Sequence, residues 1–276
     1  MTRDAATHAP SQAGRSPLSL AQHPRPSHVR PLKAFLTLTW TESKLFLREP
    51  SATFFTLGFP LLLLFAFGAI FGNGPASAPG DVGYTTRAVP GYVALTIGSL
   101  GLLSLPITLA TQRDQGILRR FRATPLRPTV VLGTQAAVNL VMLLVSTALL
   151  LVAAPIAYAV PLPPSSLLAL GALLFAGIAF LSLGFLLGAL MPTARAAQSV
   201  GMALFFPMLF LSGAAIPQFL FPDWLVTASL ALPLTHVTRL LQDAWLHGQW
   251  NGTAALVLAG TGVVSAVVAA WAFRWS

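Results

Sequence analysis

The sequence predicts an all-α integral membrane protein with six transmembrane helices, from its composition, its long apolar runs and its charge distribution. Of its 276 residues, 55% are hydrophobic and 8% are charged, whereas soluble domains carry about 25% charged residues. Several uncharged runs reach the length of about 20 residues that a helix needs to cross the hydrocarbon core. Basic residues gather on one side of these runs, which is typical of cytoplasmic loops.

The first 30 residues predict a disordered cytoplasmic tail. They are rich in Pro, Ser, His and Arg and contain no apolar run, so they cannot bury enough surface to offset the entropy cost of ordering. A secretory signal is not expected, because its apolar core is absent. An organellar transit peptide has a similar composition and remains the alternative. Residues 31–276 are expected to form one transmembrane domain.

Residues 31–49 predict an amphipathic helix that lies in the membrane interface before the first span. Its polar side chains recur at helical spacing: Lys33, Thr37, Thr41, Lys44 and Arg48. The remaining positions are largely apolar, so the lysine and arginine stems can extend along the membrane toward the headgroups. Pro50 is expected to end this helix.

Six apolar runs are expected to span the membrane, at about 52–72, 90–112, 129–155, 166–191, 196–216 and 252–273. Pro60, Pro106 and Pro207 lie within spans, where each removes a backbone donor and predicts a kink. The fourth span carries small residues that permit close helix approach, namely Gly171, Gly177, Gly184 and Gly188.

Residues 216–250 predict a hairpin of short helices that dips into one leaflet. The segment is apolar, but prolines divide it into pieces too short to cross a bilayer. Backbone at membrane depth must be helical or buried in protein. Arg239 and Asp243 are spaced i,i+4, so we expect them to pair.

The charge distribution sets the predicted topology. Seven basic residues precede the first span and five lie in the 113–128 loop, whereas only Arg87 and Arg239 fall on the opposite side. An even number of spans places both termini on one side, and the positive-inside rule makes that side the cytoplasm. This pattern explains the net charge of +9 as a topology signal, so no nucleic-acid partner is expected.

The 113–128 loop is the main functional candidate. Five of the sixteen basic residues lie in it, and Leu118 and Phe121 stand among the arginines. A solvated turn gains nothing from that apolar pair, whereas a helix that docks onto a cytoplasmic partner would.

The sequence lacks the motifs that several energy sources and types of catalysis require. A phosphate-binding loop needs Gly-Lys-Ser/Thr, but the two lysines follow Leu32 and Ser43. All seven acidic residues lie outside the span cores, which disfavours ion-coupled transport; an ATP-independent channel or ion-coupled carrier stays as one alternative. An intramembrane hydrolase is a second alternative, with Ser99 and His236 as its candidate residues. No cysteine and no metal-ligand cluster motif is present, so neither a metal site nor a catalytic site is assigned.

Taken in order, several segments resemble the ABC-2 family of membrane permeases, the transmembrane subunits of type V-like ATP-binding-cassette exporters. The resemblance covers about residues 35–274. It is carried by Phe46-Leu-Arg-Glu-Pro50, Asp114-Gln-Gly-Ile-Leu-Arg-Arg-Phe-Arg-Ala-Thr-Pro-Leu126, Pro192-Thr-Ala-Arg-Ala-Ala-Gln198, Phe206-Pro-Met-Leu-Phe-Leu-Ser-Gly213 and Pro233-Leu-Thr-His236.

The resemblance implies a role for each of several segments and a set of partner proteins. Residues 31–49 would be the elbow helix, with Lys33, Lys44, Arg48 and Glu49, and residues 216–250 a re-entrant extracellular hairpin. The helix that contacts the ATPase would comprise Gln115, Gly116, Ile117, Leu118, Arg119, Arg120, Phe121 and Arg122. The partners would be two copies of a separate cytoplasmic ATPase, a second permease in a homodimer, and the lipid bilayer.

The resemblance also implies the chemistry. This chain would be no enzyme and would hold no cofactor, since ATP and Mg would bind the partner ATPase. Family members export drugs, antibiotics, lipids or lipid-linked glycans from the cell membrane. From their residue types, Phe205, Phe206, Met208 and Phe210 are candidates to line a chamber for a hydrophobic or amphipathic substrate, although they could equally face lipid or core.

Overall fold

The regular secondary structure in the described part of the chain is entirely helical. The computed structural model describes residues 31–74, 82–116, 128–216, 218 and 221–272. Within them, six helical segments are long and apolar enough to cross a membrane: Pro50–Phe71, Tyr84–Asp114, Val130–Tyr158, Ser166–Leu190, Ala194–Leu211 and Gly252–Ala272. These confirm the six predicted spans. The predicted tail, residues 1–30, lies outside the described residues.

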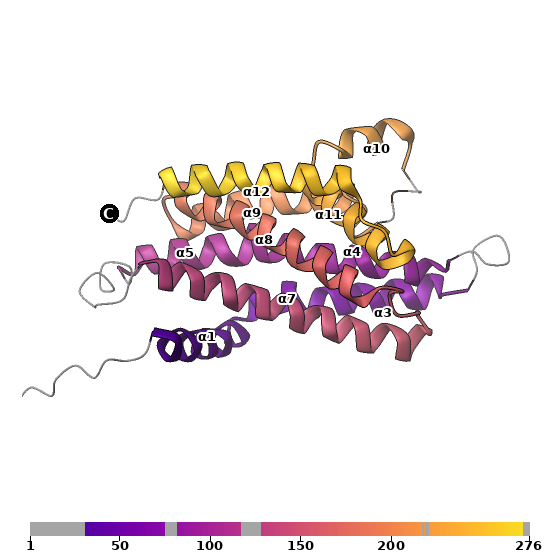
Figure 1. Cartoon of the computed structure of the whole chain (residues 1–276), viewed down its shortest axis with the longest axis horizontal. Coiled ribbons are helices and arrows are strands. Elements are labelled where there is room, and N and C mark those ends of the chain that lie inside the picture. Colours follow the sequence, from indigo (N-terminus) through magenta and orange to yellow (C-terminus); the bar gives the residue numbers. More distant parts are fainter. Residues whose placement is uncertain (1–30, 75–81, 117–127, 217, 219–220, 273–276) are drawn as a thin grey trace, which may run out of the picture.

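The helices run side by side along the long axis of the molecule (Figure 1). The first span comprises α2 (Pro50–Thr53), η1 (Phe54–Gly58) and α3 (Phe59–Phe71), and the second comprises α4 (Tyr84–Ser99), η2 (Leu100–Ser104) and α5 (Leu105–Asp114). The other four spans are α7 (Pro128–Tyr158), α8 (Ser166–Leu190), α9 (Ala194–Leu211) and α12 (Gly252–Ala272).

The second span is the centre of the bundle. Of its most apolar stretch, 89% is buried inside the protein, against 28% to 44% for the other spans. It packs against α3, α7, α8, α9 and α11. It begins at Tyr84, earlier than the predicted residue 90, because its polar first turn is bonded within the protein. The Thr85 hydroxyl donates to Gly72 O, and the Thr86 amide and hydroxyl donate to Asn73 Oδ1, both at 2.9 Å.

Two π-helices interrupt the first two spans, each just before a proline. η1 ends two residues before Pro60, and η2 ends two residues before Pro106. Pro60 has no N–H to donate to the Thr56 carbonyl four residues earlier. The Ser146 hydroxyl of α7 donates to Thr56 O instead, at 2.7 Å. A side chain from a neighbouring span thus satisfies the carbonyl that the proline leaves free.

Glycines bring the fourth and fifth spans against the second. A Cβ added to Gly184 would lie 2.6 Å from Gly101 O, and one added to Gly201 would collide with Leu102 O. Gly177 and Gly188 also touch neighbouring leucines, whereas a Cβ on Gly171 would meet nothing within 4 Å. The close approach predicted for the fourth span therefore holds at three of its four glycines.

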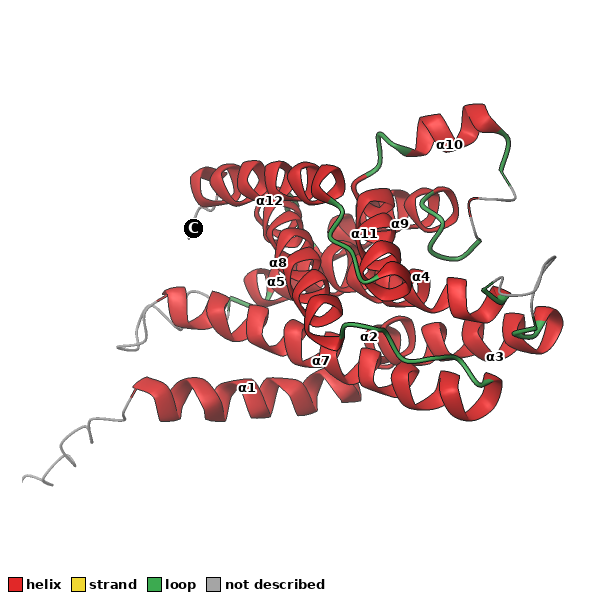
Figure 2. Ribbon diagram, turned by 45° about the vertical axis from the view of Figure 1, so that its right-hand side comes forward, coloured by secondary structure: helices red, strands yellow, loops and turns green. Residues whose placement is uncertain are grey.

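Three short helices precede the last span: α10 (Asp223–Ser229), α11 (Pro233–Gln242) and η4 (Asp243–His247). The chain bends by 102° between α10 and the continuous α11–η4 segment. α10 projects from one end of the bundle, while α11 runs inside it (Figures 1 and 2). Leu234, Val237, Leu240 and Leu241 of α11 are fully buried.

The two ends of the bundle differ. The start of α1 (Pro31–Arg48) and the end of α12 lie at the end opposite α10 (Figure 1). α5 ends and α7 begins at that same end, on either side of residues 117–127. The even number of spans therefore places α1, the root of the 113–128 loop and the end of α12 together.

Candidate functional site

The root of the 113–128 loop is tied to the turn between α8 and α9. Asp114 is the last residue of α5, and its Oδ2 accepts a hydrogen bond from the Ala194 amide at 2.9 Å. Ala194 is the first residue of α9, where backbone amides have no partner within the helix. The Asp114 carboxylate thus satisfies an unpaired donor and places negative charge at the positive end of α9.

Arg113 contacts the other side of the same turn. Its Nη1 donates to Ala189 O, in the last turn of α8, over a long 3.5 Å. The last carbonyls of a helix lack intrahelical donors and favour positive charge. Arg113 and Asp114 therefore match the opposite polarities of the two helix ends that they face. Together they join the end of the second span to the fourth and fifth spans.

The predicted ATPase-contact residues continue from this root. Gln115 is exposed, and its amide donates to Thr111 O at 3.0 Å. Gly116 has a φ of 66°, a left-handed conformation that favours glycine, and ends the helix there. The remaining predicted contact residues lie outside the described residues: Ile117, Leu118, Arg119, Arg120, Phe121 and Arg122.

The predicted elbow segment coincides with α1, which packs along α7. Ser43 and Phe46 are buried, and Gln135 Nε2 of α7 donates to Glu42 Oε2 over 3.4 Å. On the exposed side, Lys44 Nζ lies 4.8 Å from the centre of the Trp40 ring. Arg48 and Glu49 are also exposed, and Lys33 belongs to α1, but its side chain is outside the described part.

A crevice of about 40 Å³ lies between the first, second and fifth spans. Both η1 and η2 contribute to it, and π-helices occur frequently at functional sites. Seven of its lining residues are polar, although most of the surface that the lining exposes is apolar; the residues are Glu49, Ser51, Thr56, Ser99, Ser104, Thr108, Gln198, Ala52, Phe55, Leu103, Ile107 and Met202. The sequence analysis did not predict this crevice, because its polar residues come from three spans and only the packing of those spans brings them together.

The four predicted chamber residues divide into two pairs. Phe205 and Met208 are buried, and the Phe205 ring packs edge-on against Phe55 of η1 at 6.3 Å. Phe206 and Phe210 are 37% and 49% exposed on the outer side of α9. The first pair belongs to the core beside the crevice, and the second faces away from it, so the four do not line one space within this chain.

Ser99 and His236 have separate partners. The Ser99 hydroxyl donates to Thr96 O at 2.9 Å, and His236 Nε2 contacts Leu230 O at 2.9 Å. Among the described residues no hydrogen bond joins the two side chains. A hydrolytic serine needs an adjacent base, so this arrangement does not favour the hydrolase alternative. The described residues also hold no group of three His, Asp or Glu that could bind a metal.

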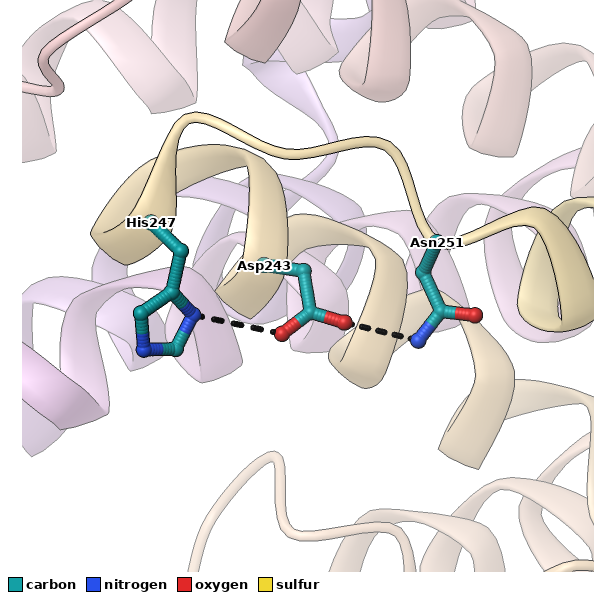
Figure 3. Close-up of polar contacts among 3 residues, drawn as sticks. All are labelled: Asp243, His247 and Asn251. Atoms are coloured by element: carbon teal, nitrogen blue, oxygen red, sulfur yellow. Dashed lines mark hydrogen bonds and ion pairs between the residues drawn. The ribbon is translucent and has the colours of Figure 1, made fainter.

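The prediction that Arg239 pairs with Asp243 is wrong: among the described residues, Asp243 has other partners. Asp243 Oδ1 lies 3.3 Å from His247 Nδ1, and Asp243 Oδ2 accepts from Asn251 Nδ2 at 2.7 Å (Figure 3). Asn251 Oδ1 also accepts from Ala254 N at 2.9 Å and so caps α12. Asp243 thus pairs with the residue four positions after it rather than with Arg239, four positions before it, and the chain after His247 brings Asn251 back to its second oxygen.

Comparison with known proteins identifies the family. The family model described as "ABC-2 type transporter" matches residues 33–246. Nodulation protein J of Sinorhizobium fredii is 38% identical over 125 residues, which are 45% of this chain and 47% of that protein. The probable multidrug ABC transporter permease YbhR of Escherichia coli is 27% identical over 178 residues, 62% of this chain and 48% of YbhR.

For a eukaryotic relative, the matched region is a smaller share of the relative's own length. ABC transporter G family member 20 of Dictyostelium discoideum is 27% identical over 161 residues, 58% of this chain and 22% of that protein. The chain spans about half the length, or less, of these curated relatives. Because the family match covers most of the chain and agrees with six apolar spans, the chain is a multi-pass membrane protein that belongs to the ABC-2 type transporter family.

Proposed function

We propose that this chain is the membrane-spanning permease subunit of an ATP-binding-cassette exporter. It moves a hydrophobic or amphipathic substrate out of the cell, using ATP that a separate cytoplasmic ATPase hydrolyses. Two permeases, as a homodimer, and two ATPases form the working unit, and both termini of each permease lie in the cytoplasm. The family membership and the names of the relatives support this class of function.

The observation that carries the proposal is the Asp114–Ala194 hydrogen bond at the root of the 113–128 loop. A loop that only reverses the chain needs no bond to a different pair of helices. Through Asp114 and Arg113, a displacement of this loop acts on α8 and α9 as well as on α5. Three of the six spans would therefore respond to one cytoplasmic contact.

The predicted contact surface suits a protein partner. Leu118 and Phe121 are apolar and would pack into a cleft of the ATPase, while Arg119, Arg120 and Arg122 would meet its acidic rim or anionic headgroups. The crevice shares the second and fifth spans with the loop root and is completed by the first span. Its volume of about 40 Å³ is far below that of a ligand pocket, so within one chain it would contact only part of an amphipathic molecule, through an apolar lining that includes Glu49 and six other polar residues.

The proposal is tested by purifying the tagged full-length chain from its own cells in mild detergent. We expect an ATPase with Walker A and signature motifs to co-purify in a 1:1 ratio, and its hydrolysis rate to depend on the permease. A triple Arg119→Ala, Arg120→Ala, Arg122→Ala variant should lose this dependence. An Arg195→Ala change at the neighbouring turn is the matched control. Purification without any ATPase, combined with full transport activity, would overturn the proposal.

A further inference from the structure

α10 carries a large apolar side chain that the described part of the chain leaves mostly uncovered. Trp224, the second residue of α10, is 70% exposed, and Leu230, directly after the helix, is also exposed. α10 lies against α9 and stands to the side of the other spans at its end of the bundle (Figures 1 and 2). In water, this tryptophan would forgo the free energy that burial of its large apolar surface provides. What surrounds the side chain therefore depends on where α10 lies relative to the membrane.

Hydrogen bonds attach the last residue of α10 to its neighbours. Ser229 is buried, and its Oγ accepts from Gln218 Nε2 at 2.9 Å. Gln218 Nε2 also contacts Leu211 O, at the end of α9, over 3.4 Å. Ser229 O accepts from the Thr235 hydroxyl of α11 at 2.6 Å. The protein thus holds α10 at its end, whereas Trp224 lies near its start, more than one helical turn away.

Two other exposed tryptophans, at the two ends of α12, mark where the membrane surfaces lie. Trp250 precedes the start of α12 and Trp271 lies in its last turn; the two side chains are 45% and 88% exposed. The 21 residues of α12 extend over about 31 Å at ~1.5 Å per residue, which matches the hydrocarbon core of about 30 Å. Tryptophan is enriched at both membrane interfaces, where its ring lies at the level of the headgroups. Trp250 and Trp271 therefore mark the two edges of the hydrocarbon core, and α10 lies at the same end of the bundle as the start of α12 (Figure 1).

The charges of α10 leave its attachment to the indole ring. Asp223 is exposed at the first position of α10, and the helix contains no basic residue. Adjacent side chains are separated by about 100° around a helix, so Asp223 can stay in water while Trp224 faces the membrane surface. Without a basic residue, α10 gains nothing from anionic headgroups. A tryptophan ring, which is apolar with one N–H donor, suits the layer where acyl chains meet ester carbonyls and water.

We propose that α10 is a membrane anchor whose Trp224 inserts into the headgroup and carbonyl layer of the leaflet on its side of the bundle. Leu230 adds a second, smaller apolar contact. Because Ser229 is bonded to α11 and, through Gln218, to the end of α9, the anchor holds the segment before the buried α11 at the membrane surface. The anchor requires a bilayer but neither an ATPase nor transport, so its failure would leave the proposed function intact.

Quenching of Trp224 fluorescence by brominated lipids tests the contact. The full-length chain and its Trp224→Phe variant are reconstituted in phosphatidylcholine bilayers, and the difference between their spectra gives the emission of Trp224. Lipids brominated near the carbonyl end of the acyl chain should quench this emission about twofold more than lipids brominated near the chain centre, as expected for an interfacial ring. Trp245→Phe is the matched control, because Trp245 is 4% exposed and its emission should respond little to either lipid.

Two results would overturn the lipid contact. Quenching of the Trp224 emission by aqueous iodide, but by neither brominated lipid, would place the ring in water. Quenching by none of the three would mean that protein, such as a second copy of the chain, covers the ring.

A probe on the next turn of α10 tests whether Trp224 holds the helix in place. The chain has no cysteine, so Thr227→Cys, at an exposed position of α10, accepts a single spin label. A water-soluble nickel complex should collide with this label about twofold more often after Trp224→Ala, because the start of α10 leaves the interface once its apolar contact is lost. Trp271→Ala removes an exposed tryptophan at the other end of α12 and should leave the collision rate unchanged. The same rate with and without Trp224 would overturn the anchoring role.

Discussion

Asp114 Oδ2 lies 2.9 Å from the amide nitrogen of Ala194, which joins the last residue of the second span to the first residue of the fifth. The second span is the most buried of the six candidate membrane spans. Its end, the end of α8 and the start of α9 are thus held together at the point where the 113–128 loop leaves the membrane domain. This junction is where we expect cytoplasmic motion to enter the spans.

Asp114→Asn should weaken this junction without unfolding the protein. The amide side chain keeps an acceptor oxygen but loses the negative charge that faces the positive end of α9. ATPase stimulation by the permease should fall roughly two- to fivefold, which corresponds to the ~0.3–1 kcal/mol of a charge at a helix terminus. Asp223→Asn makes the same change in α10, at the opposite end of the bundle, and should leave the stimulation unchanged. Equal losses in both variants would argue against a special role for the junction.

Ser146→Ala should destabilise the bundle by about 1 kcal/mol, the scale of hydrogen bonds between membrane helices. The change leaves Thr56 O without its 2.7 Å donor. Pro60→Ala restores a backbone N–H that can serve the same carbonyl. The double variant Ser146→Ala with Pro60→Ala should therefore recover much of the lost stability in thermal unfolding in detergent. If Pro60→Ala recovers none of the stability that Ser146→Ala loses, the missing N–H of Pro60 is not the reason that Thr56 O accepts a hydrogen bond from Ser146.

Gly184→Ala and Gly201→Ala should each lower the stability by about 1–3 kcal/mol, the usual cost of overpacking. Their added methyl groups would press on the backbone carbonyls of Gly101 and Leu102 in η2. Gly171→Ala and Gly260→Ala place the same methyl group where nothing lies within 4 Å, so these controls should unfold at the wild-type temperature. A uniform effect across all four variants would contradict the close contacts.

The 113–128 loop should be accessible only from the cytoplasm. The chain contains no cysteine, so a single Arg120→Cys substitution gives one reactive thiol. A membrane-impermeant maleimide should label it in inverted vesicles and leave it unlabelled in intact cells or right-side-out vesicles. Asp223→Cys in α10 should show the reverse pattern, because α10 lies at the other end of the bundle. Labelling of Arg120→Cys from outside would overturn the topology.

Composition and hydropathy predicted the spans well, because membrane crossing depends on the length of an apolar run. The start of the second span was missed at Tyr84, where Thr85, Thr86 and Arg87 make the sequence polar. Hydrogen bonds that Thr85 and Thr86 donate to Gly72 O and Asn73 Oδ1 keep that turn helical, and a hydropathy pattern does not detect such tertiary partners. The π-helices η1 and η2 were missed for a related reason, although Pro60 and Pro106 marked their positions.

The candidate site was only partly predictable. Asp114 was recognised within a family-like motif, but its bond to Ala194 depends on how α5, α8 and α9 pack. The expected Arg239–Asp243 pair failed because Asp243 has two competing partners, His247 and Asn251, and the position of Asn251 depends on how the chain folds back after His247.

The most direct test is transport in proteoliposomes that contain the full-length chain with or without its ATPase. A set of lipophilic dyes and fluorescent lipids serves as probes, with ATP and Mg²⁺ supplied on the side of the ATPase. The proposed function predicts probe movement only when the ATPase and hydrolysable ATP are both present, and its loss when Leu118 and Phe121 are both changed to Ala. Movement at the same rate through the chain alone would contradict it.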